Sequence, residues 1–137
     1  MNRILVDTNV LVYSIDEDSK FNSRAVKLLT DPSFNLYTTS KNLSEFLVVL
    51  TRGIEVPIST NESIDLLESL LKTITVLYPS KSSYRQFKEL LLKYNPSGLL
   101  IHDFEIASIG LDNRINKIAT INIKDFKNID EISIVEF

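Results

Sequence analysis

The chain has 137 residues, of which 44% are hydrophobic and 24% are charged, a balance typical of one ordinary globular domain. It contains no cysteine and one histidine, which excludes disulfides, thiolate metal sites and a zinc site built from several histidines. Its 18 acidic and 15 basic residues give a formal net charge of −3, whereas proteins that bind nucleic acid through bulk charge usually carry a basic surplus. Any contact with nucleic acid must therefore be local, or be mediated by a cation held between carboxylates and phosphate.

No stretch is rich enough in glycine, proline or serine to act as a linker, so we expect a single domain over residues 1–137. The first residues lead directly into a strand-like segment without the layout of a signal peptide. The apolar runs are far shorter than a membrane span. We therefore expect a soluble cytoplasmic protein that has no membrane partner.

Short apolar strands alternate with amphipathic helices along the chain. The pattern predicts strands at 4–6, 34–38, 74–78, 118–121 and 132–135. It predicts helices from Val10 onward and at 21–30, 41–52, 60–72, 82–93 and about 100–113, with a short helical turn after the fourth strand. Helix 60–72 is expected to start at a Ser59 or Thr60 cap and to direct Ile64 and Leu67 inward. This alternation predicts a parallel sheet with helices on both faces, in which ligands collect at the carboxyl ends of the strands.

Two acidic residues stand where such a sheet would bind a ligand. Asp7 directly follows the first apolar strand, although a helix N-cap is an equally good interpretation of an aspartate there. Asp103 opens a late helix, where it could simply complement the helix dipole. Small residues at 107, 108 and 110 of that helix indicate close packing on the sheet, which would bring its first turn near the strand ends.

Two further acids are weaker candidates when each is taken alone. Glu45 lies in a helix that is apolar around most of its circumference, and its alternative role is an ion pair with Lys41 on a solvated stripe. Asp125 follows the fourth strand by one helical turn, and its alternative is a polar surface turn.

Together these residues place three or four carboxylates near one edge of the sheet. Like charges packed closely destabilise a fold, and a hard divalent cation removes that repulsion. Ligation by oxygen alone favours Mg²⁺ or Mn²⁺ over zinc. The residues therefore predict a magnesium site that Mn²⁺ can also fill, able to activate water and to bind phosphate oxygens.

Four short motifs follow one another in order along the chain: Val6-Asp7-Thr8-Asn9-Val10, Ser44-Glu45-Phe46-Leu47 through Leu50-Thr51-Arg52, His102-Asp103, and Ala119-Thr120-Ile121-Asn122 with Asp125-Phe126. In these motifs the sequence resembles the PIN domain family and, within it, the VapC-type toxin ribonucleases of toxin–antitoxin pairs. The resemblance implies a three-layer α/β/α sandwich with a central, mainly parallel sheet. It also implies a Mg²⁺-dependent endoribonuclease, the toxin of a type II toxin–antitoxin pair, that leaves a 5′-phosphate and a 3′-hydroxyl.

The resemblance also assigns the site residues. Asp7, Glu45 and Asp103 would be the three core catalytic and metal-binding acids. Asp125 would be the fourth, because Asn122 stands where many members have aspartate, and Asn122 would then be a neutral ligand or a supporting donor. The side chains expected to hold the carboxylates in place are Thr8, Asn9, Thr120 and Asn122. A second departure is Phe104, since relatives often carry a small residue after the third acid.

Partners follow from the same resemblance: an RNA substrate, a second copy in a homodimer and a cognate antitoxin protein. Basic residues flanking the motifs could contact phosphate, although solvated surface charge is the more ordinary role for each: Lys20, Arg52, Lys124 and Lys127. A nucleotide-binding domain is disfavoured because the chain has no glycine-rich phosphate loop. A phospho-acceptor domain would need a further aspartate at mid-chain. The remaining alternative is a degenerate PIN fold that serves as an interaction module without nuclease activity.

Overall fold

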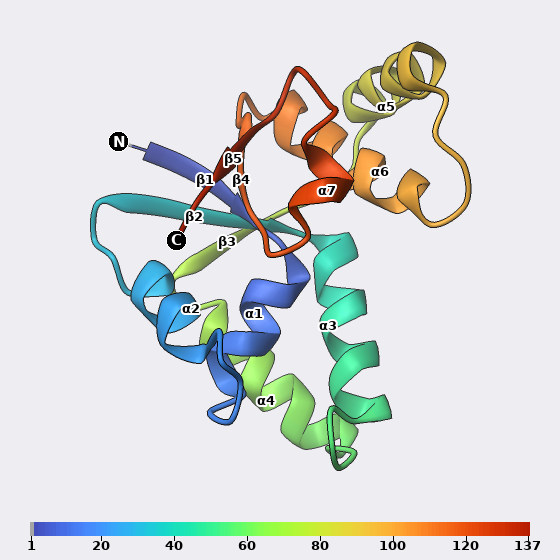
Figure 1. Cartoon of the computed structure of the whole chain (residues 1–137). Helices are drawn as coiled ribbons and strands as arrows, with labels where there is room; N and C mark the ends of the chain where they lie inside the picture. The colour runs from blue at the N-terminus through green and yellow to red at the C-terminus, as the bar shows by residue number, and fades with distance from the viewer. Residues whose placement is uncertain (1) are drawn as a thin grey trace.

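The computed structural model describes residues 2–137, which form one twisted parallel sheet between two sets of helices (Figure 1). The five strands are β1 (Asn2–Val6), β2 (Phe34–Thr39), β3 (Ile74–Leu77), β4 (Lys117–Ala119) and β5 (Ser133–Val135). They pair in the order β3-β2-β1-β4-β5, and every pair is parallel. The predicted three-layer α/β/α sandwich is thus confirmed, with a sheet that is parallel throughout the described chain.

Within residues 2–137, seven helices flank this sheet: α1 (Thr8–Ile15), α2 (Asn22–Leu29), α3 (Ser40–Arg52), α4 (Thr60–Leu70), α5 (Lys81–Tyr94), α6 (Leu100–Asp112) and α7 (Ile123–Phe126). Helices α1 to α4 lie on one side of the sheet, and α5 to α7 lie on the other (Figure 1). No helix in residues 2–137 combines the length and the apolar character needed to cross a bilayer.

The core has two halves because successive side chains of a strand point to opposite faces. On β1, Ile4 and Val6 belong to the half under α1 to α4, and Leu5 belongs to the half under α5 to α7. All three are at most 2% exposed, so β1 is the buried central strand that its apolar run predicts.

Helix α6 approaches β1 closely at Gly110. A Cβ at this position would lie 3.1 Å from the carbonyl oxygen of Ile115 and 3.2 Å from a methyl carbon of Leu5. Ala107 and Ser108 are fully buried in the same helix. The predicted close packing of small residues is confirmed, and it fixes the position of the first turn of α6.

Some local predictions need correction. Ser59 caps α4 as expected, but Ile64 is 37% exposed and does not point inward, while Leu67 is buried. The fourth strand ends at Ala119 rather than at residue 121, because Thr120 turns its hydroxyl toward Asp7 instead of continuing the ladder. Helix α1 starts at Thr8, before Val10, because Asp7 caps it.

Candidate functional site

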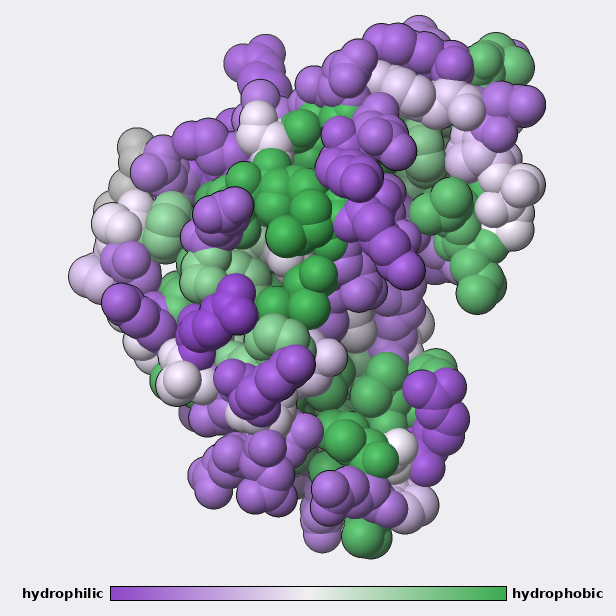
Figure 2. All heavy atoms as spheres, in the orientation of Figure 1, coloured by the Kyte–Doolittle hydropathy of each residue, from purple (hydrophilic) through white to green (hydrophobic). Residues whose placement is uncertain are grey.

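The carboxyl edge of the sheet holds a cavity of about 440 Å³ in which three of the predicted acids meet. Asp7 follows β1, Glu45 lies in the middle of α3, and Asp103 lies in the first turn of α6. The surface is hollowed between the part formed by α5 and α6 and the part formed by α3 (Figure 2). The full lining comprises Asp7, Thr8, Asn9, Val12, Tyr13, Glu45, Val49, Arg52, Gly53, Ile54, Asp103 and Asn122.

Asp7 is buried and held by hydrogen bonds on both carboxylate oxygens. Its Oδ1 accepts from the backbone N–H of Thr8 at 2.9 Å and from Nδ2 of Asn42 at 3.3 Å. Its Oδ2 accepts from the hydroxyl of Thr120 at 2.7 Å and, more weakly, from Nδ2 of Asn9 at 3.4 Å. Asp7 therefore fills both roles that its position allows: it caps α1, and it presents a fixed carboxylate at the edge of the sheet.

A second chain of hydrogen bonds joins Glu45 to the same network. The hydroxyl of Thr8 donates to Oε2 of Glu45 at 2.8 Å and accepts from Nδ2 of Asn42 at 3.0 Å. The side-chain oxygen of Asn42 in turn accepts from the backbone N–H and the hydroxyl of Thr39, which caps α3. Asn42 is fully buried and links Asp7 to the Thr8 hydroxyl that holds Glu45, and the sequence motifs did not point to it.

The signal that could have found Asn42 is a capping pattern. Thr39 and Asn42 form a capping box, each accepting from the other's backbone N–H. A threonine at the start of a helix, followed three residues later by asparagine, places a polar amide about one helical turn before Glu45.

The predicted supporting residues also meet at the end of β4. Nδ2 of Asn9 donates to the Thr120 hydroxyl at 3.3 Å, and Oδ1 of Asn9 accepts from the backbone N–H of Ile121 at 3.2 Å. The Thr120 hydroxyl also accepts from the backbone N–H of Asn122 at 3.0 Å. Thr8, Asn9 and Thr120 thus contact the carboxylates as the resemblance implies, and Asn122 contributes its backbone to the same cluster.

Burial and mutual repulsion make Asp7 and Asp103 harder to ionise than they are in water. Burial raises the pKa of Asp103 to about 7, and the charges of Asp7, Asp125 and Glu45 add to that effect. Burial also raises the pKa of Asp7 against the opposing hydrogen bonds from Thr120 and Thr8. The carboxyl groups are therefore close enough to oppose one another's ionisation.

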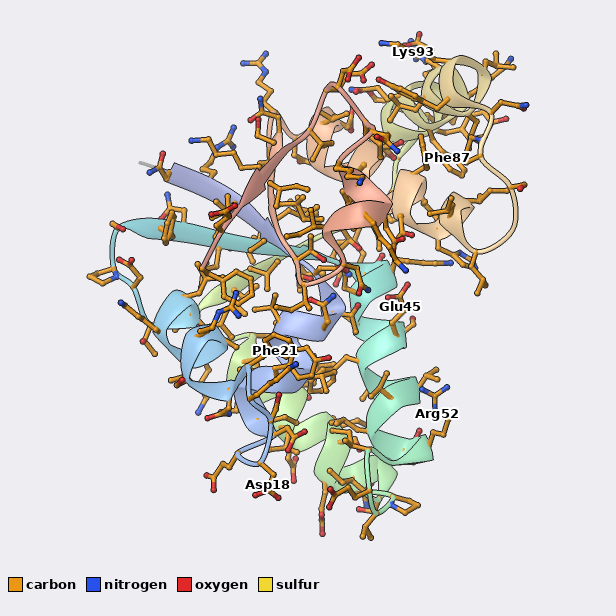
Figure 3. All side chains as sticks on the ribbon, viewed as in Figure 1. Asp18, Phe21, Glu45, Arg52, Phe87 and Lys93 are labelled. Carbon is orange, nitrogen blue, oxygen red and sulfur yellow. The ribbon has the colours of Figure 1, made fainter. Side chains whose placement is uncertain are left out.

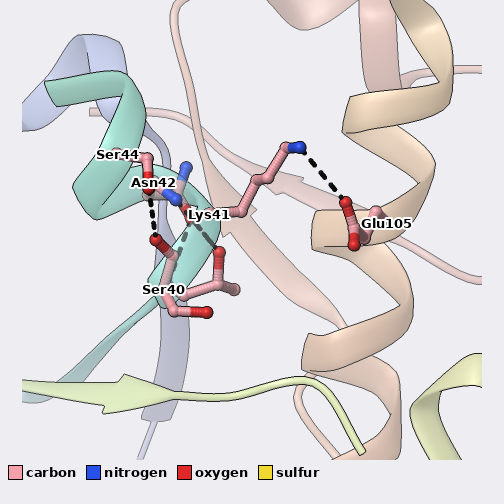
Figure 4. Close-up of polar contacts among 6 residues, drawn as sticks. Ser40, Lys41, Asn42, Ser44 and Glu105 are labelled. Carbon is pink, nitrogen blue, oxygen red and sulfur yellow. Dashed lines mark hydrogen bonds and ion pairs between the residues drawn. The ribbon is translucent and has the colours of Figure 1, made fainter. Parts of the chain in front are cut away.

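Lys41, which helical spacing places beside Glu45, does not neutralise this cluster. Nζ of Lys41 lies 3.4 Å from Oε1 of Glu105 on α6, so the alternative pairing of Lys41 with Glu45 is wrong (Figure 4). In the described part of the chain, none of the four predicted acids has an ion-pair partner.

The two candidates for the fourth position differ in where they lie. Asn122 lines the cavity, whereas Asp125 lies one turn farther along α7 and contributes through its charge, which raises the pKa of both Asp7 and Asp103. Phe104, the other departure from the family pattern, is buried and packs against the ring of Tyr94 at a centroid distance of 5.8 Å. Its bulk is accommodated on the side of α6 that faces the core.

The donor set suits a hard cation bound partly through water. Within residues 2–137, no three acidic or histidine side chains are gathered tightly enough to hold a metal ion by themselves. The available donors are carboxylate and amide oxygens, and Mg²⁺ usually keeps several water ligands and takes only one or two carboxylates directly. Asp7 has four donors around its two oxygens, so direct ligation there would replace a long contact such as that from Asn9.

Of the predicted phosphate contacts, one lines the cavity. Arg52 projects from α3 on the same side as Glu45 (Figure 3). Lys20, Lys124 and Lys127 are not part of the lining, and Nζ of Lys20 lies instead over the ring of Phe21, 5.1 Å from its centroid.

Solved structures of similar fold come from toxin–antitoxin systems. VapBC2 from Rickettsia felis, bound to a DNA fragment from their promoter, matches with a TM-score of 0.73 and 20% identity over 98% of both chains. VapBC-1 from nontypeable Haemophilus influenzae matches with a TM-score of 0.72 and 22% identity over 98% of this chain and 97% of that one. VapC20 from Mycobacterium tuberculosis, a sarcin-ricin loop cleaving toxin, matches with a TM-score of 0.69 and 13% identity over 90% and 93% of the two chains.

At these identities the structural matches establish the shared fold. No curated protein sequence matches the chain. The sequence model of the PIN domain matches residues 4–132, nearly the whole chain. The chain therefore belongs to the PIN domain family.

Proposed function

We propose that the protein is a Mg²⁺-dependent endoribonuclease and the toxin of a type II toxin–antitoxin pair. The observation that supports this most directly is the convergence of Asp7, Glu45 and Asp103 on one cavity without an ion-pair partner in the described chain. Burial raises the pKa of Asp103 to about 7 and the neighbouring acids add to that rise, so keeping these carboxylates ionised together is costly unless a cation binds there.

Asp7, Glu45 and Asp103 would hold the magnesium ion, with Asn122 or Asp125 completing the set. When bound, magnesium supplies Lewis-acid chemistry: it neutralises charge on the phosphodiester and makes water more acidic. Mn²⁺ would serve the same residues because it also prefers oxygen ligands.

The chain's own residues fix and shape this site. Thr120 and the backbone of Thr8 hold the Asp7 carboxylate, and the Thr8 hydroxyl holds that of Glu45. Asp103 is half-buried in the first turn of α6 and lines the same cavity, so it completes the acidic wall on which the ion would bind. In-line attack of water on phosphorus with cleavage of the bond to the 3′ oxygen would leave a 5′-phosphate and, once that oxygen takes up a proton, a 3′-hydroxyl.

The proposed partners follow from the family and its structural neighbours. A toxin–antitoxin complex from Klebsiella pneumoniae is among the structural neighbours, and VapC20 is a sarcin-ricin loop cleaving toxin. By analogy we propose an RNA substrate, a homodimer and a cognate antitoxin for this chain. A basic side chain of the antitoxin would complement the acidic cavity.

The proposal is tested by incubating purified protein with ribosomal and transfer RNA in Mg²⁺ and sequencing the ends of the products. We expect cleavage that EDTA abolishes, with 5′-phosphate ends. Asp7→Asn, Glu45→Gln and Asp103→Asn should each reduce cleavage at least 100-fold, the scale of losing one electrostatic contact to a transition state.

Glu105→Gln is the matched control, because Glu105 lies two residues after Asp103 on α6 but pairs with Lys41. It should cleave at the wild-type rate. Full activity in Asp7→Asn, Glu45→Gln or Asp103→Asn would refute the assignment and favour the interaction module without nuclease activity.

A further inference from the structure

The cavity that holds the acids has a second end with different chemistry. Tyr13 comes from α1, Val49 and Arg52 come from α3, and Ile54 follows that helix; all four line the same cavity as the acids. One end of the cavity is therefore acidic, and the other combines a cation with apolar and aromatic side chains.

Arg52 is free to bind a ligand. It is exposed, and in residues 2–137 it has no carboxylate within ion-pair distance. It lies seven residues after Glu45, and Figure 3 shows both side chains leaving the same side of α3. Because a helix rises 1.5 Å per residue, the two positions are about 10 Å apart along the axis. Arg52 is thus placed for an anion beside the one at the acids, rather than for the same anion.

Tyr13 lines this end of the cavity with an aromatic ring, which packs against a second aromatic ring. Its half-buried ring packs on Phe21 with a centroid distance of 5.0 Å and an interplanar angle of 43°. Phe21 is itself flanked by cations, since the guanidinium of Arg24 lies 5.5 Å from its centroid and Nζ of Lys20 lies 5.1 Å from it. A ring held in this way can pack against a nucleobase without being ordered at the moment of binding.

We infer that this end of the cavity is a subsite for the nucleotide next to the scissile phosphate of single-stranded RNA. Arg52 binds the neighbouring phosphate, and the base packs against Tyr13 between Val49 and Ile54. The inference rests on the proposed nuclease function and adds to it the residues that position the substrate.

Charge distribution favours RNA over a peptide in this place. An acidic peptide would suit Arg52 but would be repelled by the carboxylates, and a basic antitoxin side chain would suit the carboxylates but leave Arg52 without a partner. An RNA strand can place one phosphate at Arg52 and the neighbouring phosphate at the acids, once a bound cation offsets the charge of the carboxylates. The volume of about 440 Å³ falls in the usual range for small-ligand sites, roughly 300–1,000 Å³.

The test measures binding of a fluorescently labelled 12-nucleotide single-stranded RNA of random sequence by anisotropy, in Mg²⁺ at several salt concentrations. All proteins also carry Asp103→Asn so that the RNA stays intact. Arg52→Ala should weaken binding about tenfold or more, because hydrogen bonds to charged groups are the strong ones. It should also lower the slope of log affinity against log salt by about 0.7, the value for one phosphate contact on a single strand.

Arg85→Ala is the matched control. Arg85 is an exposed arginine on α5 that lies outside this cavity, so its loss removes the same charge. Binding should stay within twofold, with an unchanged salt slope. Tyr13→Leu should weaken binding severalfold, while Tyr13→Phe should retain it, because the ring and not the hydroxyl packs on the base.

Equal losses of affinity in Arg52→Ala and Arg85→Ala would show that RNA is held by bulk charge, and would overturn the subsite. Unchanged binding in Arg52→Ala would overturn it too. So would the absence of any RNA binding. The experiments can distinguish failure of the subsite from failure of the nuclease proposal. Arginine-dependent binding without cleavage by the wild type would keep the subsite and remove the nuclease. In a parallel cleavage assay with proteins that keep Asp103, wild-type cleavage together with an unchanged KM in Arg52→Ala would keep the nuclease and remove the subsite.

Discussion

At the scale of single residues, the site depends on side chains that each satisfy a structural need and a chemical one. Asp7 caps α1 and is also the most buried acid of the cavity, 5% exposed. Asn42 completes the capping box of α3 and donates to both Asp7 and Thr8. Because these bonds also build the helix ends, the carboxylates are positioned by elements that must form for the protein to fold.

Asn42→Ala should therefore reduce stability and cleavage together. It removes the donor to Asp7, the donor to the Thr8 hydroxyl and the acceptor for Thr39, all in the core. We expect a loss of about 1–3 kcal/mol in the free energy of unfolding, the cost of leaving buried polar groups unpaired. Urea unfolding and cleavage rates measure the two effects.

Asn113→Ala is the control, because Asn113 donates at 2.8 Å to the carbonyl of Ile109 at the far end of α6. It should lose stability without losing activity beyond the unfolded fraction. An Asn42→Ala protein with wild-type cleavage would show that Asn42 serves the fold alone.

Asp103 makes the stability of the metal-free protein depend on pH. Its pKa is about 7 in the folded chain, against an ordinary value of 3.8, so the folded state holds a proton that the unfolded state has released. Stability therefore falls as pH rises from about 4 to 7. Asp103→Asn should remove this loss and raise Tm at pH 8 by several degrees in EDTA, with a smaller difference at pH 4. A variant that lowers Tm equally at both pH values would contradict this account.

At the scale of elements, the sequence predicts helices and strands better than the contacts between them. The apolar spacing of α3 identifies the helix to within one residue at its start, and Asp103 falls in the first turn of α6 as expected. The partner of Lys41 could not be predicted, because helical spacing offers Glu45, while the folded chain brings Glu105 of α6 within 3.4 Å of the Lys41 ammonium. Likewise Ile64 fits the apolar stripe of α4 but is 37% exposed, since the helix buries a narrower face than the stripe.

The pairing of Lys41 with Glu105 gives a test at this scale. A double-mutant cycle with Lys41→Ala and Glu105→Gln, followed by urea unfolding, should show a coupling of about 0.2–1 kcal/mol, as for other partly exposed ion pairs. The matched cycle with Lys41→Ala and Glu45→Gln should show a coupling near zero. A larger coupling in the second cycle would restore the pairing within α3.

At the scale of the whole molecule, chain topology explains why distant acids meet. Helices α1 and α3 follow β1 and β2, so they begin at the carboxyl edge of the sheet; α6 leads into β4 and starts at that same edge. The order of elements, read from sequence, therefore predicts that Asp7, Glu45 and Asp103 share an edge. It does not predict the opposite wall of the cavity. Tyr13 and Arg52 line that wall because α1 packs against α3, and a contact between two helices has no local signature in the sequence.

Metal binding should be visible as a property of the entire fold. A cation that binds the folded chain and not the unfolded one raises stability, by about 1.4 kcal/mol at ten times its Kd. Millimolar Mg²⁺ or Mn²⁺ should therefore raise Tm, and more at pH 8 than at pH 5, where the proton on Asp103 competes with the ion. Differential scanning calorimetry at both pH values measures this.

Glu45→Gln combined with Asp103→Asn should abolish the metal-induced shift, and Glu105→Gln should keep it, because Glu105 pairs with Lys41. An equal shift in the double variant would place the ion elsewhere on the protein. If Tm did not change with metal at pH 8, where Asp103 has released its proton, the acids would have no cation to offset their repulsion. The interaction module would then explain the cavity better than the nuclease.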